Sequence, residues 1–403
     1  MRTIMWQNRN YLRLLSAQVT SLIGTGVSSV CLALLAYDLA GKDASMVLST
    51  VFAIKMLAYI LLAPVFSTLS QWLPKRQVMV ALDITRAAVF IFLPFVTNVW
   101  EVYLLTFVIN ACSAWFTPLF QSTLPLILPD KTEYTKALSL SRLAYDLEQM
   151  FSPLLTALLL SVLSFRYLFM LDAATFVVSA ILILLCVIPN LTKTTSHRQQ
   201  LTLTGISRGI HDYLSKPSLR ALWMAYLSVA SASAMVLVNT VVYVHEVLNG
   251  GDKQTALAMG IVGLGSLVIA LRLPVWLESI PAKRFHWLGM FAISGAFCIG
   301  SFTPGWVGFI AICLAMGVGM SCIQTTAGLF ITEASQGDDT GPYFAAHFSL
   351  THFWWLVTYL SAGFSVKLFG LGYGYLFMGT LSALAMLAYY YSCSRASQSS
   401  SIF

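Results

Sequence analysis

Charge is scarce in this chain of 403 residues: only 10% of its residues are Asp, Glu, Lys or Arg, whereas 58% are hydrophobic. A soluble globular domain carries about a quarter charged residues, so this composition argues against a soluble protein. Long apolar runs recur along the chain, and about 20 consecutive apolar residues suffice to cross a bilayer as a helix. Because lipid offers the backbone no hydrogen-bond partners, we expect these runs to be α-helical.

The sequence also lacks the short motifs of metal binding and ATP hydrolysis. No C-x-x-C or H-x-x-x-H occurs to supply a ready pair of cysteine or histidine ligands for a metal, and no glycine-rich phosphate loop is present. The seven cysteines are an odd number scattered mostly through apolar runs, which predicts reduced thiols. The loops are short and poor in His, Asp, Glu and Ser, which disfavours a membrane-embedded enzyme. We expect no cofactor and assign no metal site.

The apolar runs predict about twelve spanning helices. Lysine and arginine concentrate in the loops on one side of this arrangement, fifteen against four on the other. Cytoplasmic loops carry such an excess, so we expect both termini in the cytoplasm. The same asymmetry accounts for the net charge of +7 without a nucleic-acid partner. The predicted helices are 11–37, 46–70, 76–97, 100–125, 138–163, 166–189, 219–245, 255–277, 284–303, 305–330, 342–366 and 371–391.

The chain is divided by a basic polar stretch into two halves of similar length that echo each other. ALSLSRL at 137–143 resembles HFSLTHF at 347–353, and FQST at 120–123 resembles IQTT at 323–326. Duplicated six-helix halves are typical of secondary transporters, which bind substrate between the halves near the bilayer midplane. We therefore expect an all-α membrane protein of two six-helix pseudo-repeats. The predicted domains are an N-terminal bundle 1–189, a cytoplasmic linker 190–218, a C-terminal bundle 219–391 and a polar cytoplasmic tail 392–403.

Ionisable residues within the apolar runs are few, and each costs at least about 2.5–3.5 kcal/mol at bilayer depth. Such residues should pair, face the protein interior or take part in transport. Together with three amides in the same runs, the candidates for a substrate or proton pathway are Asp38, Lys55, Asp83, Arg86, Asn110, Gln121, Asp172, Gln324, His347 and His352.

Spacing along the helices predicts two local pairs. Asp83 and Arg86 are three residues apart, and Arg142 and Asp146 are four apart. Residues at these separations share a helix face and can meet. For both pairs we expect a structural ion pair near the cytoplasmic surface.

Two other charged positions depend on how neighbouring helices meet. A hairpin between the first two predicted helices would bring Lys55 within reach of Asp38, so Lys55 is either a paired lysine or a substrate ligand. Asp172 lies near the outer start of its predicted helix, where it can simply face water.

His347 and His352 lie in one apolar run, GPYFAAHFSLTHFWWLVTYLSAGF. Residues five apart on a helix point about 140° away from each other, so the two rings cannot close on one metal by themselves. The alternatives are a histidine hydrogen-bonded within the helix packing, or a gating or proton-coupling role, since histidine titrates near physiological pH.

Several longer stretches carry a family resemblance. WFTPLFQSTLPLILPDKTEYTKALSLSRLAYDLEQMFSPLL at 115–155, FAIKMLAYILLAP at 52–64, ALDITRAAVFIFLPF at 81–95 and FAAHFSLTHFWWLVTYLSAGF at 344–364 resemble bacterial nickel-resistance exporters of the major facilitator superfamily. More distantly the chain is similar to siderophore and macrolide exporters. The resemblance implies export of a small solute across the bacterial cytoplasmic membrane, driven by proton exchange, with nickel as one substrate.

The chain departs from that family's pattern at named positions. The loop between the second and third helices, STLSQWLPKR, has Ser67 and Gln71 in place of the motif's glycine and aspartate, while Lys75 and Arg76 remain. The polar groups of the fourth predicted helix are amides where an arginine is common, and the tail has no histidine. A siderophore, metal chelate or drug-like organic molecule fits Lys55 and the arginine at position 86 at least as well as nickel does.

The implied fold also predicts a cytoplasmic gate. In it the fifth predicted helix packs against the eighth across the two halves, so Arg272 would meet Asp146 or Glu148, beside Arg142, when the outer side is open. Asp146 also qualifies as the proton carrier, as do Asp38, Asp83 and His352. We expect a monomer that works by alternating access, with a small molecule or ion and protons as its partners.

Overall fold

The computed structural model describes residues 4–69, 73–128, 155–188, 210–335 and 341–399. It also describes nine single positions between these ranges: Asp130, Glu133, Ala137, Leu140, Ser141, Ala144, Glu148, Phe151 and Ser152. Within these residues all regular structure is helical, and eight candidate membrane spans are present. Two compact units are formed, one by Met1–Leu39 with Ile54–Arg198, and the other by Ala40–Ala53 with Gln199–Phe403.

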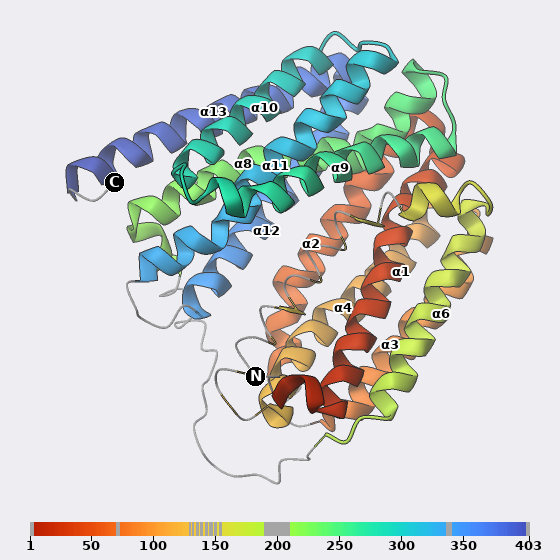
Figure 1. The fold of residues 1–403 in the computed structure, drawn as a ribbon. Coiled ribbons are helices and arrows are strands. Elements are labelled where there is room, and N and C mark those ends of the chain that lie inside the picture. The colour runs from red at the N-terminus through yellow and green to blue at the C-terminus, as the bar shows by residue number, and fades with distance from the viewer. Residues whose placement is uncertain are drawn as a thin grey trace. The chain divides into compact units, whose positions relative to one another are not determined.

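The helices of the first unit run side by side in Figure 1. In the first unit, α3 packs between α4 and α6, around a core that includes Tyr11, Met79, Phe116 and Ile183. The α2 helix starts within the segment assigned to the second unit and ends in the first. The helices are α1 (Arg9–Ala40), α2 (Ala44–Leu69), α3 (Lys75–Phe92), α4 (Val99–Ile127) and α6 (Phe165–Leu184).

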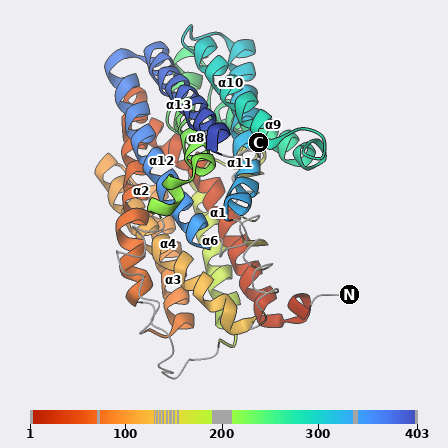
Figure 2. The ribbon, with the colours of Figure 1, turned by 90° about the vertical axis from the view of Figure 1, so that its left-hand side faces the viewer.

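In the second unit α8 is the central helix. It is buried along most of its length and contacts α11, α12 and α13, while α9 and α10 pack on α11 (Figure 1; Figure 2). A π-helical turn, Tyr243–Val247, continues α8. The helices are α8 (Pro217–Val242), α9 (Asp252–Trp276), α10 (Ala282–Gly300), α11 (Trp306–Ser335), α12 (Gly341–Phe369) and α13 (Leu371–Ser399).

Local sequence explains where several helices begin and end. Glu101 caps α4, because its Oε2 accepts from the backbone N–H of Thr97 at 2.9 Å and of Asn98 at 3.0 Å. Gly41 and Gly370 have φ values of +53° and +85°, a left-handed conformation that glycine adopts without steric cost. These two glycines therefore allow α1 and α12 to end within one or two residues of the next helical segment.

The α9 and α11 helices approach each other through small residues. A Cβ at Gly317 would overlap the Val262 carbonyl oxygen, and one at Gly265 would lie 2.6 Å from the Leu314 oxygen. Ser266 Oγ donates to the Gly317 carbonyl at 2.9 Å. Small residues that let two backbones approach are typical of helix pairs in membranes, where lipid does not drive helices together.

The predicted helices overlap described helices at every position except the fifth, but α13 continues to Ser399, through most of the predicted tail 392–403. The fifth helix, predicted at 138–163, falls largely on residues outside the described part of the chain, and so do 190–209 of the predicted linker. The end of the linker is helical at 210–215. Ala40–Ala53 groups with the second unit, so the division does not follow the predicted halves at the start of α2.

Replacing Gly317 with alanine should destabilise the protein. The added Cβ would overlap backbone atoms of α9, which cannot move aside as a flexible side chain can. Overpacking of this kind lowers the free energy of unfolding by about 1–3 kcal/mol. Gly328→Ala on the same helix is the matched control, because nothing lies within 4 Å of its added Cβ. Thermal unfolding in detergent should show a lower melting temperature for Gly317→Ala only, and equal melting of the two variants would contradict the close approach.

Candidate functional site

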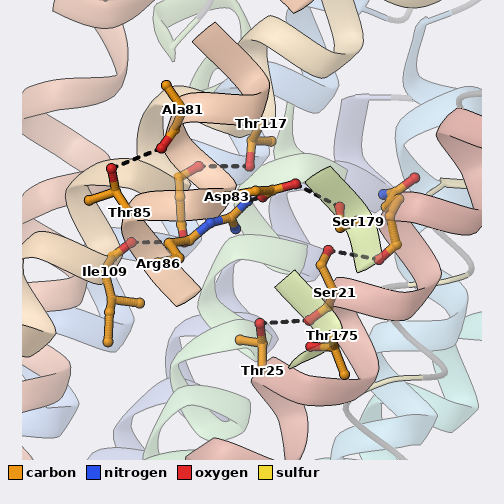
Figure 3. Close-up of polar contacts among 12 residues, drawn as sticks. Ser21, Thr25, Ala81, Asp83, Thr85, Arg86, Ile109, Thr117, Thr175 and Ser179 are labelled. Atoms are coloured by element: carbon orange, nitrogen blue, oxygen red, sulfur yellow. Dashed lines mark hydrogen bonds and ion pairs between the residues drawn. The ribbon is translucent and has the colours of Figure 1, made fainter. Parts of the chain in front are cut away.

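A buried ion pair lies in the interior of the first unit. The Arg86 guanidinium contacts the Asp83 carboxylate one turn earlier on α3, and the two residues are 5% and 0% exposed. Ser179 Oγ, on α6, donates to Asp83 Oδ2 at 2.7 Å. Figure 3 shows the pair on α3 with Ser179 facing the carboxylate. The pair predicted from the spacing of these two residues is present, and it is buried among helices.

Two aromatic rings complete the surroundings of Arg86. Its guanidinium carbon lies 4.6 Å from the ring centre of Phe116 on α4 and 4.3 Å from that of Phe176 on α6. A cation over the face of an aromatic ring is attracted by the ring quadrupole. Arg86 Nε is buried without a hydrogen-bond partner, so the charge is held by one carboxylate and two ring faces.

Asp172 on α6 is fully buried, at 0% exposed, and the expectation that it faces water is wrong. Ser28 Oγ from α1 donates to its Oδ2, and Thr175 Oγ1 lies 3.1 Å from its Oδ1. A Cβ at Gly24 would overlap the same carboxylate. The absence of a side chain at Gly24 therefore lets α1 close over this acid, whose hydrogen-bond partners are hydroxyl groups.

Lys55 does not meet Asp38 as the hairpin suggested. Asp38 Oδ2 pairs instead with Arg166 at 2.6 Å, at the start of α6. Lys55 is half-buried on α2 and lies within electrostatic range of Glu148. Asp38 pairs with Arg166 and not with Lys55 because α6 packs beside α1, which brings the Arg166 guanidinium group to Asp38.

The carboxylate of Glu148 lies against α1 near Asp172. A Cβ at Gly26 would lie 2.6 Å from Glu148 Oε1, and Glu148 and Asp172 are within electrostatic range of each other. The carboxyl groups of Asp83, Glu148 and Asp172 thus lie within electrostatic range of Arg86 or Lys55. This arrangement can bind and release a proton.

The amides predicted for the pathway are placed as follows. Asn110 Nδ2 donates to the Thr106 carbonyl at 2.8 Å within α4, and Gln324 is half-buried on α11. The structure does not describe the side chain of Gln121. Gln18 is not among the predicted pathway residues, and its Nε2 donates to Ser141 Oγ at 2.6 Å. Partners such as Gln18, Ser28 and Ser179 escape sequence analysis because a single hydroxyl or amide in an apolar helix is common.

The two histidines of α12 do not converge. His347 Nδ1 lies 2.8 Å from the Tyr213 hydroxyl, and His352 Nδ1 lies 2.7 Å from the Phe348 carbonyl. Burial raises the pKa of the Tyr213 phenol well above its usual value of 10, so the hydroxyl keeps its proton. Among the described residues, no three His, Cys, Asp or Glu side chains gather as metal ligands would.

The predicted gate and loop residues are described only in part. Arg272 is exposed on α9, while Arg142, Asp146 and Gln71, and the side chain of Ser67, lie outside the described residues. In the loop motif, Lys75 begins α3 after Pro74. Arg76 Nη1 donates to the Cys186 carbonyl at 3.3 Å, at the end of α6.

Comparison with protein families gives a match over most of the chain. The model of the Major Facilitator Superfamily matches residues 14–359. The uncharacterized MFS-type transporter YfiS of Bacillus subtilis (strain 168) is 22% identical over 389 residues, which are 93% of this chain and 90% of that protein.

Other relatives match shorter stretches. The uncharacterized MFS-type transporter YkuC of the same organism is 25% identical over 213 residues, and macrolide efflux protein A of Streptococcus pyogenes is 25% identical over 181 residues. The matches cover 52% and 44% of this chain. This chain spans about half the length of these two relatives, 49% and 44%.

Two solved structures share the fold. The inward-facing, unoccupied form of a bacterial homolog to the human lysosomal transporter Spinster has a TM-score of 0.73 at 11% identity, covering 95% of this chain and 97% of that one. The nucleoside transporter NupG has a TM-score of 0.68 at 12% identity, covering 95% and 98%.

Removing one partner of the buried ion pair should cost more stability than removing the charge of both. Arg86→Met leaves the Asp83 carboxylate buried and unpaired, a change that typically costs about 3–5 kcal/mol. The double variant Asp83→Asn with Arg86→Met leaves no buried charge at either position. Melting temperatures in detergent should therefore be lowest for the single variant, and a double variant that melts lower still would contradict the assignment.

Proposed function

This chain belongs to the Major Facilitator Superfamily, a family of membrane transporters, and we propose that it exports a small organic solute from the cytoplasm in exchange for protons. The chain is a multi-pass membrane transporter and not an enzyme. Export is supported by the relative named as a macrolide efflux protein. We place the protein in the bacterial cytoplasmic membrane as a monomer of twelve helices with both termini inside.

The buried charges of the first unit carry the proposal of proton exchange. Asp83 pairs with Arg86, and Glu148 has Lys55 within electrostatic range. Among the described residues Asp172 forms no ion pair: its hydrogen bonds come from hydroxyl groups, and Arg86, which is paired with Asp83, acts on it from beyond ion-pair distance. A carboxylate without an ion pair of its own is costly in a low-dielectric interior, so Asp172 is more stable there when it carries a proton. We propose that Asp172 is the proton carrier.

This assignment gives alternating access a chemical basis. A protonated, neutral Asp172 is compatible with the closed packing of α1 over α6. Loss of the proton leaves a buried carboxylate, which favours a conformation in which water reaches it. Protons that enter from outside and leave to the cytoplasm can thus drive the transport cycle, while the organic solute moves outward.

We propose an organic molecule as the substrate, and nickel is the alternative. The resemblance of several stretches to nickel exporters implies the metal. Nickel would need several nitrogen, sulfur or oxygen ligands at one point, and the described His, Cys, Asp and Glu residues offer no group of three. The macrolide efflux relative favours an organic solute.

The substrate class can be measured in cells. A drug- and metal-sensitive bacterial host that produces the protein should accumulate less erythromycin or norfloxacin than the same host with an empty vector. Its nickel content, by elemental analysis, should be unchanged. Lower nickel with unchanged drug content would replace the organic proposal with the metal one.

The proton carrier has its own test. In everted membrane vesicles, uptake of the exported drug should rise when the interior is made acidic. In Asp172→Asn the rise in uptake on acidification should be about tenfold smaller or absent, because an amide cannot carry the proton. Asp38→Asn is the control, since Asp38 forms a partly exposed pair with Arg166. An unchanged response in Asp172→Asn would remove this residue from the proton path.

A further inference from the structure

The α12 helix has two faces that differ in how their polar atoms are satisfied. One face packs on α8: Trp354 Nε1 donates to the Trp223 carbonyl at 3.0 Å, and Thr358 Oγ1 donates to the Ala230 carbonyl at 3.1 Å. The neighbouring indole, Trp355, turns to a different face. Its Nε1 is buried without a hydrogen-bond partner, which leaves a donor to be satisfied.

Trp355 belongs to an aromatic ladder, which we define as Phe348, His352 and Trp355. These residues are spaced four and three apart and so lie on one face of α12. The rings of Phe348 and His352 are tilted by 36° with centres 3.8 Å apart, and those of His352 and Trp355 meet edge to face, at 84° and 5.2 Å. His352 Nδ1 lies 2.7 Å from the Phe348 carbonyl. Because a carbonyl can only accept, that nitrogen carries a hydrogen, and the bond holds the ring in place.

The ladder continues a face of α12 that α2 covers further along the helix. One turn further along the same face, Tyr359 stacks on Phe52 of α2 with ring centres 4.9 Å apart. One turn beyond that, Gly363 lies directly against Ser49 of α2. The face that carries the ladder is therefore the face that α2 covers at Tyr359 and Gly363. Phe348, at 40% exposed, leaves aromatic surface accessible at the other end of the ladder.

We propose that the aromatic ladder of α12 binds the exported solute, and that this solute is a planar aromatic molecule with a hydrogen-bond acceptor. Seven residues of helix span about 10 Å, the length of two or three fused rings. The solute would stack on the accessible ring of Phe348 and extend along the edge of the ladder, and its carbonyl or ring oxygen would accept from Trp355 Nε1. This inference rests on the proposed function, because it names the substrate class of the proposed exporter.

The ladder can be tested by direct binding to the purified, full-length protein. Norfloxacin is a suitable probe, because it is planar, fluorescent and carries a ring carbonyl, so its binding can be followed by fluorescence anisotropy. Phe348→Ala should raise the Kd about tenfold through lost stacking. Trp355→Phe, which keeps a ring and removes the donor, should raise it about fivefold.

The matched control lies on the same helix. Phe353→Ala removes an aromatic ring that is 48% exposed but not on the ladder, and it should change the Kd less than twofold. Equal effects of Phe348→Ala and Phe353→Ala, an unchanged Kd in Trp355→Phe, or no norfloxacin binding by the natural protein would each overturn the inference. Melting temperatures of the variants show that they are folded.

A second substrate separates the failure of this inference from that of the proposed function. Erythromycin has no aromatic ring. If vesicles export erythromycin while norfloxacin does not bind, the exporter proposal stands and the ladder proposal is wrong. If neither compound is exported nor bound, the proposed function fails as well.

Discussion

Neutralising the Arg86 guanidinium within a helical interior is the constraint on which the first unit depends. A cation at this position needs a counter-charge and polarizable neighbours, and α3 supplies Asp83, α6 supplies Ser179 and Phe176, and α4 supplies Phe116. Three helices must therefore keep a common register for the charge to be tolerated. A shift of any one of them would leave Arg86 or its carboxylate without part of its surroundings, so the pair ties the packing of the unit to its electrostatics.

Glycine positions determine how closely the other helices approach. Gly24 and Gly26 let α1 lie against the carboxylates of Asp172 and Glu148, and Gly317 lets α11 lie against the backbone of α9. In lipid, where the hydrophobic effect does not drive helices together, such close contacts supply much of the association energy. The same feature thus serves stability in the second unit and brings two acids beside one helix in the first, where proton binding is proposed.

The positions of the described helices could be predicted from the sequence, because bilayer thickness requires long apolar runs and each run must satisfy its own backbone. The Asp83–Arg86 pair was also predictable, since three residues along a helix fix the neighbourhood of two side chains. The family was recognisable from stretches of helices in both halves, and the match over residues 14–359 confirms it. The nickel substrate implied by the resemblance is not supported by the relatives found.

The partners across helices were decided by the tertiary structure alone. Asp38 pairs with Arg166 and not with Lys55, and Asp172 is buried under Ser28 of α1. The structure likewise decides that the indole N–H of Trp354 has a hydrogen-bond partner while that of the adjacent Trp355 has none. The physical reason is that apolar residues cover almost every face of these helices, so the sequence by itself determines which segments cross the membrane but carries little record of which face of a helix turns toward which neighbour.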